Sequence, residues 1–481
     1  MTVQHLPGRP RRCLVIGGGA SGLAAALALC DAAGAQADPA LRFEVDLIEA
    51  ADRLGGAIET VRLGDFLVER GPDMFITDKP GGLDLCRRLG LEDQLVKTDP
   101  QFGGSLVVRD GRPVPVPESF QLLGTPRIRA VLASPIFSWT GKLRMALEPL
   151  IGRSAQASDE SVGAFVRRRL GREALERLVQ PLVGGIYTGD PERLSLAATL
   201  PRFIEMERES GSLWQGMRAK AADREKATRG ARYGLFASLR GGLSELVEAA
   251  QRSLETRCRL RLKTEVQAIR RIDEDRGFGV ELSSGETIQA DAVILAVPCK
   301  VASRLVGDLP GDLAARLGEI ESASSVVVST GHRLDQVEHP LDAYGLVVPR
   351  IEGRRVLAVS FASRKLAGRA PEGRVLFRTF VGGELQPELV ELDDQELRVL
   401  VMEELEALLG VRGDPEFIDV ARYQEMMPQY NVGHLDRVET IERLVAQIPG
   451  LVLAGNAFHG VGLPDCIASG FAAATSLLDE N

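Results

Sequence analysis

Three glycines near the start of the chain have the spacing of a tight phosphate-binding turn. Gly17, Gly19 and Gly22 form the pattern GxGxxG, and they follow a short apolar run, Arg12–Gly17. After a strand, the first glycine of this pattern permits a tight turn, the second lets the backbone approach a pyrophosphate, and the third lets helix and strand pack closely. The sequence therefore predicts a dinucleotide-binding turn at this point.

An Ala/Leu-rich stretch, Ala20–Ala33, predicts the helix that such a turn opens. Its first residues, Ala20 and Ser21, would present free backbone N–H groups and the positive end of the helix dipole to phosphate charge. The next predicted strand, Phe43–Glu49, ends in an acidic residue. Because an acidic side chain at this place binds ribose hydroxyls in dinucleotide-binding units, we expect Glu49 to hold the adenosine ribose.

A second pair of glycines, preceded by an arginine, indicates which of two dinucleotides the turn would bind. Arg53, Gly55 and Gly56 follow Glu49 in the pattern E-x3-R-x-G-G. The glycines would let the main chain approach a cofactor, and the arginine would add a charge-assisted hydrogen bond. This extension is typical of FAD-binding oxidoreductases, so the sequence favours FAD over NAD.

The elements that must position these residues follow in an order that suggests discontinuous domains. A β-α-β unit comes first, and a mostly helical block with proline breaks follows over about 80–230. Strands near 260–297 precede a strand-rich stretch at 320–435 that holds one long helix, Asp394–Leu409. The chain then returns to a strand, Leu451–Ala454, a glycine-rich turn and a helix near Ile467–Leu478.

Composition excludes several classes of protein. The chain has 481 residues, 44% apolar and 26% charged, which is typical of a globular protein with several domains. Its net charge of −9 disfavours a general nucleic-acid binder. Six Cys without CxxC and five His without HExxH predict no metal site. No apolar stretch reaches a membrane span, and the glycines inside Cys13–Cys30 argue against a signal peptide there.

Further motifs along nearly the whole chain resemble one family. The sequence is similar to the oxygen-dependent protoporphyrinogen/coproporphyrinogen oxidases, within the flavin amine oxidase superfamily. The segments that carry the resemblance are Val15–Leu27, Glu49–Thr60, Val68–Phe75, Gly184–Ser195, Leu239–Leu246, Ala290–Pro298, Met427–Val438 and Leu453–Gly470. Of these, YTGDP, MPQY and GVGLPDCI are the most specific to porphyrinogen oxidases.

The resemblance implies a role for each matching residue. Gly17, Gly19 and Gly22 would hold the pyrophosphate of FAD, Glu49 the adenosine ribose, and Arg53 and Gly56 the phosphate side. The remaining implied contacts are Gly71 and Pro72 against the isoalloxazine ring, Val266 with the adenine through its main chain, Gly455 and Asn456 near the ribityl–phosphate, and Val461, Gly462 and Leu463 along the flavin ring. Asn456 stands where superfamily members often have Asp.

The resemblance also implies the activity. We expect non-covalently bound FAD and a six-electron oxidation of a porphyrinogen to the porphyrin with O2, in haem biosynthesis. Whether the substrate is coproporphyrinogen III or protoporphyrinogen IX stays open, with a mild preference for the former. Lys79 is the expected partner of a substrate carboxylate, with Arg87 and Arg88 as weaker candidates, and no catalytic acid or base is legible.

The implied fold is α/β and α+β, with three domains. A Rossmann-like FAD-binding domain would combine 10–79, 233–300 and 436–481, a mixed-sheet substrate-binding domain 301–435 with about 211–232, and a helical domain 80–210. We expect a cytoplasmic protein. Peripheral membrane contact through the apolar and basic stretch Ser119–Ile151 and transfer of the product to a ferrochelatase stay open.

Other readings remain at this stage. A flavin amine oxidase or carotenoid-type oxidoreductase would share the fold, and a non-catalytic FAD-containing scaffold would share the cofactor. Within the motifs, His459 could relay protons, Cys466 could link covalently to a flavin, and Lys300 could associate with one. The ordinary alternatives are a surface loop histidine, a small buried residue and a solvent-facing strand end.

Overall fold

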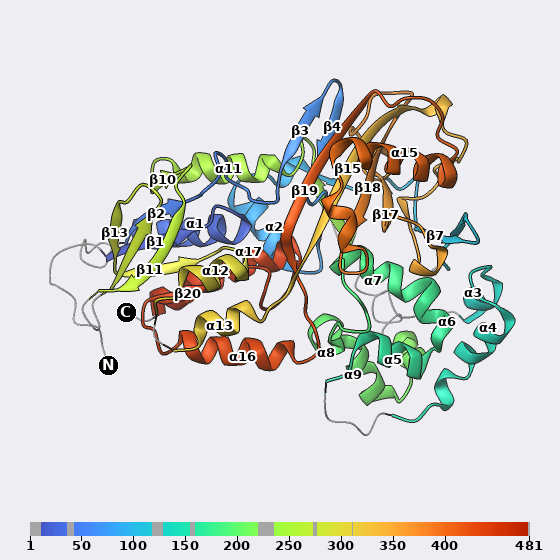
Figure 1. Cartoon of the computed structure of the whole chain (residues 1–481), viewed down its shortest axis with the longest axis horizontal. Helices are drawn as coiled ribbons and strands as arrows, with labels where there is room; N and C mark the ends of the chain where they lie inside the picture. Colours follow the sequence, from blue (N-terminus) through green and yellow to red (C-terminus); the bar gives the residue numbers. More distant parts are fainter. Residues whose placement is uncertain are drawn as a thin grey trace.

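The chain folds into three adjoining regions in a computed structural model that describes residues 11–35, 43–117, 128–153, 159–219, 235–272, 277–309 and 311–479. In Figure 1 a parallel sheet with helices on both faces lies at the left. A larger, mostly antiparallel sheet lies at the upper right, and a group of helices lies at the lower right. The predicted fold class, a Rossmann-like α/β unit joined to mixed-sheet and helical parts, is confirmed.

The first sheet has five parallel strands from distant parts of the chain. Its order is β10 (Arg259–Arg261), β2 (Phe43–Ile48), β1 (Arg11–Ile16), β14 (Ala292–Leu295) and β20 (Leu451–Leu453). Both faces of the sheet are covered, so β14 is a continuous apolar run and most residues of β1 and β2 are buried. The glycine turn after β1 therefore lies at the carboxyl edge, where parallel sheets bind ligands.

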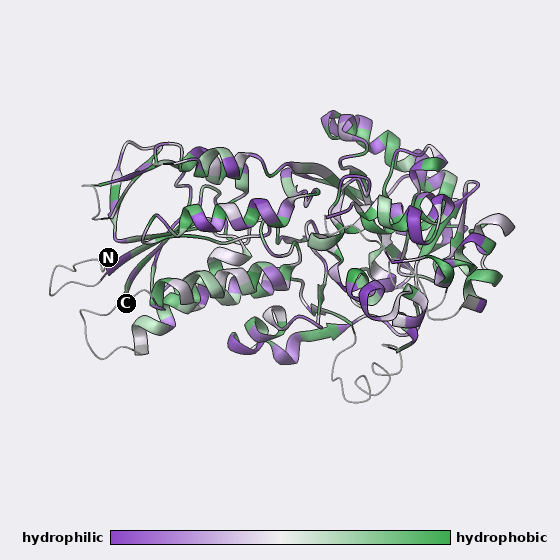
Figure 2. Cartoon of the chain, turned by 90° about the horizontal axis from the view of Figure 1, so that it is seen from below, coloured by the Kyte–Doolittle hydropathy of each residue, from purple (hydrophilic) through white to green (hydrophobic). Residues whose placement is uncertain are grey.

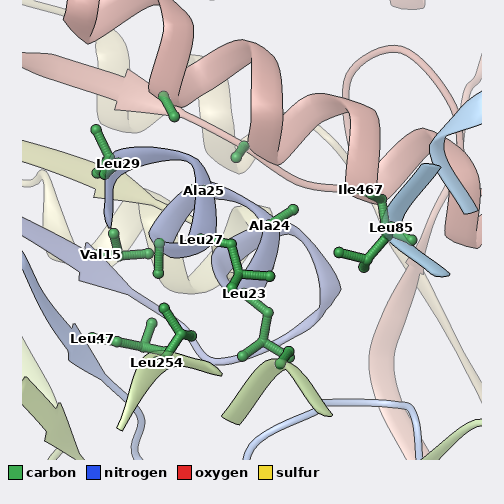
Figure 3. Close-up of a cluster of buried hydrophobic side chains, with 14 of the residues drawn as sticks. Val15, Leu23, Ala24, Ala25, Leu27, Leu29, Leu47, Leu85, Leu254 and Ile467 are labelled. Carbon is green, nitrogen blue, oxygen red and sulfur yellow. The ribbon is translucent and has the colours of Figure 1, made fainter. Parts of the chain in front are cut away.

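Three helices cover one face of this sheet: α1 (Ala20–Ala35), α11 (Ser244–Leu254) and α17 (Leu463–Asp479). Their small and aliphatic side chains pack against Val15 and Leu47 of the strands, as Figure 3 shows. A Cβ added at Gly470 of α17 would lie 2.1 Å from the Ser21 carbonyl oxygen of α1. The two helices therefore touch at backbone distance, and the chain's last helix supports its first.

The other face carries a small antiparallel sheet and further helices. These elements are β11 (Val266–Arg271), β12 (Phe278–Leu282), β13 (Thr287–Ala290), α12 (Cys299–Leu305), α13 (Leu313–Gly318) and α16 (His434–Val445). Smaller elements join this part to the rest: β3 (Thr60–Leu63), β4 (Phe66–Glu69), β5 (Phe75–Ile76), α2 (Pro80–Arg88), the 3-10 turn Glu92–Gln94, β6 (Leu95–Lys97) and β9 (Phe236–Leu239). α2 packs on α17, so the start of the range 80–210 lies with the first region.

The second sheet has seven strands. Its order is β19 (Phe417–Pro428), β15 (Ser322–Arg333), β18 (Arg374–Gly382), β17 (Ala358–Phe361), β16 (Gly345–Val347), β7 (Leu106–Arg109) and β8 (Arg112–Pro115). The apolar side of α15 (Asp394–Leu409), begun by an Asp393 capping box, covers one face, and α14 (Ala362–Lys365) follows β17. Short 3-10 turns lie at Leu334–Gln336, Arg350–Glu352 and Pro387–Glu391.

Two of these strands fall in the block expected to be helical. β7 and β8 lie at residues 106–115, and prolines 113 and 115 belong to the edge strand β8. Because an edge strand leaves half of its N–H groups outside the ladder, it tolerates proline, and the breaks expected at these prolines are wrong.

The third region is helical. It contains α3 (Ile128–Ala133), α4 (Trp139–Ala146), the 3-10 turn Glu148–Leu150, α5 (Val162–Arg169), α6 (Arg172–Ala174), a π-helical turn (Leu175–Val179), α7 (Gln180–Tyr187), α8 (Leu196–Thr199) and α9 (Pro201–Ser210). Hydrophobic and hydrophilic residues alternate along its helices in Figure 2. Among the described helices of the whole chain, none is both long and apolar enough to cross a bilayer.

Candidate functional site

Two of the three motif glycines are required by packing. Gly17 has φ +103°, and a Cβ there would lie 2.3 Å from the Ala296 carbonyl oxygen. A Cβ at Gly22 would lie 1.8 Å from the Gly17 carbonyl oxygen. Since real Cβ contacts of this length do not occur, only glycine lets α1 start this close to β1 and β14.

Gly19 differs because its surroundings are open. A Cβ built on it has no atom within 4 Å among the described residues. It forms a bridge with Gly55, and the Gly55 amide donates to the Gly18 carbonyl oxygen at 2.8 Å. A Cβ at Gly56 would lie 3.2 Å from the Gly19 Cα. The turn and the second glycine pair thus lie together at the start of α1, beside Ala20 and Ser21, and leave room for a group at Gly19.

Glu49 lies beside this turn, and its contact with a ribose stays a prediction. Its Oε2 accepts from the Gly18 amide at 2.7 Å and its Oε1 from the Ala51 amide at 2.8 Å. The Glu49 carbonyl accepts from the Thr264 amide at 2.9 Å, which brings the start of β11 near. Val266 begins β11, and its pairing with β12 is shifted by a bulge. Both residues therefore lie on one side of the glycine turn.

Arg53 braces the second glycine loop. Its Nη1 donates to the carbonyl oxygens of Leu54 and Ile58 at 3.2 and 3.0 Å. Its Nη2 donates to the Gly56 carbonyl at 2.8 Å and pairs with Glu59 at 3.2 Å. The guanidinium thus fixes the loop that closes over Gly19, and its predicted contact with phosphate stays a prediction.

The C-terminal motif forms a loop that is also open on one side. Gly455 has φ +145°, and a Cβ there has no described atom within 4 Å. The Asn456 Nδ2 donates to the Met426 carbonyl at 3.1 Å. Tyr430 Oη donates to the Asn456 carbonyl at 2.6 Å and accepts from the Gly460 amide at 2.8 Å. Two side chains therefore hold the backbone of this loop against β19.

A histidine supports Tyr430 from behind. The His434 ring stacks on the Tyr430 ring with centroids 3.9 Å apart, and its Nε2 lies 3.3 Å from the Phe458 carbonyl oxygen. Burial lowers the pKa of His434 to about 4, so its ring is neutral near pH 7. Burial likewise raises the pKa of Tyr430, so this phenol stays protonated and keeps its donor. Val461, Gly462 and Leu463 lead from the held loop into α17.

The Gly71–Pro72 turn is pressed against the second glycine loop. A Cβ at Gly71 would lie 1.7 Å from the Ala57 carbonyl oxygen and 3.3 Å from Tyr423 Oη. Burial raises the pKa of Tyr423 to about 12. A continuous line of backbone contacts thus runs from the open Gly19 through Gly56 and Ala57 to Gly71.

Lys79 is already paired. Its Nζ donates to both carboxylate oxygens of Asp465, at 2.7 and 2.8 Å, although its side chain is 51% exposed. Asp465 also accepts from the Gly462 amide at 3.3 Å, so the pair joins the 73–79 segment to the C-terminal loop. A substrate carboxylate would have to compete with Asp465. Arg87 pairs with Asp84, and Arg88 donates to Leu27 of α1.

The other candidate residues are occupied elsewhere. Lys300 pairs with Glu425, and His459 Nε2 lies 2.7 Å from Glu442 Oε1 on the exposed side of the loop. Burial raises the pKa of Cys466 to about 12, which disfavours the reactive thiolate that a covalent flavin link would need. None of the three therefore has a position that supports direct chemistry.

Sequence reasoning missed a buried charged group beside the Gly71–Pro72 turn. Asp73 pairs with Lys365 at 2.5 Å and with Arg378 at 3.0 Å. Burial acts to raise the pKa of Asp73, but the two cations outweigh it and lower this pKa to about 2. Asp73 belongs to a motif noted above, whereas the local signal for Arg378 is a charge in the middle of a mostly apolar strand, RVLFRTFVG.

Comparison with known proteins gives the class. Residues 20–478 match the family described as flavin containing amine oxidoreductase, and the chain belongs to it. It is therefore a flavin-dependent oxidoreductase.

Among similar proteins, coproporphyrinogen III oxidase of Bacillus subtilis (strain 168) is 34% identical over 473 residues, covering 97% of this chain and 98% of the relative. Chloroplastic protoporphyrinogen oxidase 1 of Arabidopsis thaliana is 30% identical over 95% of this chain and 86% of its own length. A solved structure assigned as a protoporphyrinogen oxidase of Exiguobacterium sp. 255-15 has a TM-score of 0.86, with 30% identity, over 98% of this chain and 100% of that chain. The predicted resemblance is confirmed.

The residues of this chain fit a flavin dinucleotide. Gly19 and Gly455 both have open surroundings and come from loops at the carboxyl edge of one sheet, after β1 and after β20. The N-terminus of α1 points its free N–H groups to the first opening, and Glu49 lies at its side. A nucleotide at Gly19 would have its remaining part directed along Gly56 and Ala57 toward Gly71.

Proposed function

We propose that the chain binds FAD non-covalently and oxidises a porphyrinogen to the porphyrin with O2, as a step of haem biosynthesis. The observation that carries the proposal is the pair of open glycine loops at one sheet edge, in a chain whose relatives are named for porphyrinogen oxidation. We propose FAD as the flavin because it contains an adenosine, which would contact Glu49 and Val266.

Each predicted contact then has a task. Gly17, Gly19 and Gly22 admit the pyrophosphate to the start of α1, with the amides of Ala20 and Ser21 facing it. Arg53, Gly55 and Gly56 close the second loop over it. Pro72, Val461 and Leu463 would exclude water from the ring, because none carries a polar side chain.

The chemistry belongs largely to the cofactor. A bound flavin accepts two electrons at a time, so a six-electron oxidation needs three rounds. This chain's residues bind and orient the substrate and keep competing reactions out. Lys79 is proposed as a partner of a substrate propionate, exchanging its contact with Asp465 for one with the substrate.

Coproporphyrinogen III is the proposed substrate. It has four propionates where protoporphyrinogen IX has two, so it needs more cations in its site. Three of the similar proteins, from Bacillus subtilis, Propionibacterium freudenreichii and Staphylococcus aureus, are named coproporphyrinogen III oxidase at 32 to 34% identity. The plant relatives named protoporphyrinogen oxidase are 28 to 30% identical.

The test is anaerobic mixing of the purified holoprotein with each porphyrinogen, followed by admission of O2. We expect bleaching of the flavin absorbance, then porphyrin fluorescence and uptake of about three O2 per porphyrin. Faster reaction with coproporphyrinogen III would support the proposed substrate. A flavin that stays oxidised with both porphyrinogens would overturn the proposal and favour an amine or carotenoid substrate.

Further parts of the proposal concern the whole protein. We retain the three-domain division, a cytoplasmic location and delivery of product to a ferrochelatase as proposals. Peripheral membrane contact is also proposed, through side chains of α4 and the turn after it, where Trp139 and Leu150 are about 80% exposed (79% and 80%). Residues 119–127 of the stretch Ser119–Ile151 lie outside the described residues. Co-sedimentation with anionic vesicles, lost in Trp139→Ser/Leu150→Ser and kept in Ile351→Ser, would support this contact.

A further inference from the structure

Four side chains form a row across the seven-stranded sheet. Asp419 of β19 is paired with Ser329 of β15, Ser329 with Arg378 of β18, and Arg378 with Ser360 of β17. Directly paired residues of neighbouring antiparallel strands lie on the same face of a sheet. Ser329 and Arg378 are almost fully buried, at 1% and 2% exposure. We call these four residues the polar row.

The polar row faces the turn that carries Gly71 and Pro72. Arg70 donates from Nε and Nη2 to both oxygens of Asp419, at 2.6 to 3.2 Å. Arg378 Nη2 donates to the carbonyl oxygens of Gly71 and Arg70, and its Nη1 pairs with Asp73 at 3.0 Å. The sheet therefore holds the turn from both of its ends.

Stability alone is a weak reason for this arrangement. Burying a charged pair costs desolvation energy that its attraction often only offsets, and apolar residues of similar volume can replace such pairs without loss. The guanidinium of a buried arginine is planar, and its N–H groups point in fixed directions. It therefore fixes the positions of the two carbonyl oxygens and the carboxylate that it contacts. Lys365 supplies a second cation to Asp73, at 2.5 Å, so Arg378 is not needed merely to neutralise that charge.

A displacement of this turn would reach the proposed cofactor. The turn packs directly on Ala57, and the loop of Gly56 packs on Gly19. Both contacts are between backbone atoms, with no flexible side chain to absorb a shift. The line of contacts from the sheet to the dinucleotide turn is therefore stiff.

We propose that Arg378 is a positioning residue for the flavin: through the Gly71 carbonyl and Asp73 it sets where the Gly71–Pro72 turn lies against the isoalloxazine ring. The inference rests on the FAD part of the proposed function and not on its substrate. Arg378 thereby couples the sheet of the substrate region to the affinity and the electronic environment of the cofactor.

The test compares three variants by FAD titration of the apoprotein and by the absorbance spectrum of the holoprotein. Arg378→Met, which keeps the length of the side chain but none of its donors, should weaken FAD binding about tenfold and shift the flavin bands. Arg378→Lys keeps the charge but loses the fork, so we expect about a threefold weakening and a smaller shift. The matched control is Arg374→Met, on the same strand but paired with Glu416 at its half-exposed end, and it should bind FAD as the wild type does.

Unchanged affinity and spectrum in Arg378→Met would overturn the proposal, even if the variant melted at a lower temperature. If Arg378→Met does not fold, Arg378→Lys decides alone, and wild-type affinity and spectrum in it would overturn the proposal. No porphyrinogen enters these measurements. A wild-type protein that binds FAD but oxidises neither porphyrinogen would therefore contradict the proposed substrate and leave the role of Arg378 standing.

Discussion

At the residue scale, glycines that share one motif have different tasks. Gly17 and Gly22 are glycines because backbone atoms occupy the place of a Cβ, whereas Gly19 is surrounded by open space. The first two are therefore required by the fold, whereas we propose that the third leaves space for a ligand. This division makes separate predictions for stability and for cofactor content.

Gly19→Leu should fold and lose its yellow colour, because the added side chain would fill the space proposed for the pyrophosphate. The flavin-to-protein ratio after purification measures this, with circular dichroism to check the fold. Gly34→Leu is the matched control, since Gly34 also lies on α1 with no described atom near its Cβ position. Full FAD occupancy in Gly19→Leu would contradict the phosphate assignment.

His434 predicts how stability depends on pH. Its pKa is about 4 in the folded protein and about 6.5 when unfolded, so the unfolded chain binds a proton more readily as pH falls from 6.5 to 4. The free energy of unfolding should therefore fall over this window, by up to about 3 kcal/mol from this residue at about 1.4 kcal/mol per pKa unit. His332, also buried with a pKa of about 4, adds to the same loss.

The expected signature is a shallower pH dependence of the melting temperature in His434→Phe. Tyr430→Phe is the comparison, because it loses the hydroxyl that holds the loop but keeps the histidine buried. It should be less stable at every pH with the wild-type slope. Equal slopes in wild type and His434→Phe would contradict the assignment.

Residues in local motifs were predictable, and residues brought together by the sheet were not. The roles of the glycine patterns and of Glu49 can be predicted from their spacing along the chain. The roles of Arg378 and Asp419 depend instead on strand register, which places Arg378 opposite Ser329 on one side and Asp419 opposite it on the other. Lys79 was expected to be the partner of a substrate carboxylate, which stays a prediction, and its pairing with Asp465 could not be identified without the fold.

At the scale of elements, the close contact between β1 and α1 requires a residue without a side chain, Gly22. Gly22→Ala would place a methyl group 1.8 Å from the Gly17 carbonyl oxygen, a backbone atom that cannot rotate away as a flexible side chain could. We expect a loss of about 3 kcal/mol or an insoluble protein. Gly34→Ala on the same helix should instead be stabilising by about 0.5 kcal/mol. Chemical unfolding measures both, and a neutral Gly22→Ala would show that α1 can move away from the strand.

Elements with strong periodicity were predicted well. The first β-α-β unit and the helix Asp394–Leu409 agree with the structure. β7 and β8 were missed because short strands with prolines look like irregular chain until a neighbouring strand pairs with them. The neighbour of β7 in the sheet, β16, lies more than 200 residues further along the sequence, so its pairing could not be predicted locally.

At the scale of the whole molecule, the proposed FAD site joins distant segments of the chain. Its contacts come from the loops after β1, β2 and β20 and from the start of β11. A ligand that binds only this assembled state stabilises the whole protein, by about 2.7 kcal/mol at one hundred times its dissociation constant. Removal of FAD should therefore lower the melting temperature, and FAD should restore it. FMN, which lacks the adenosine expected at Glu49, should restore less, and equal rescue by FMN would contradict the adenosine contacts.

The strand order of the parallel sheet also has a consequence for synthesis. β1 lies in the middle of the sheet, between β2 and β14, and β14 pairs in turn with β20. On the ribosome, β1 and α1 are made long before β14, which pairs with β1, and before α17, which packs on α1. We therefore expect the apolar faces of this first unit to be covered late in translation, and the FAD site that we propose to be complete only once residue 463 has left the exit tunnel.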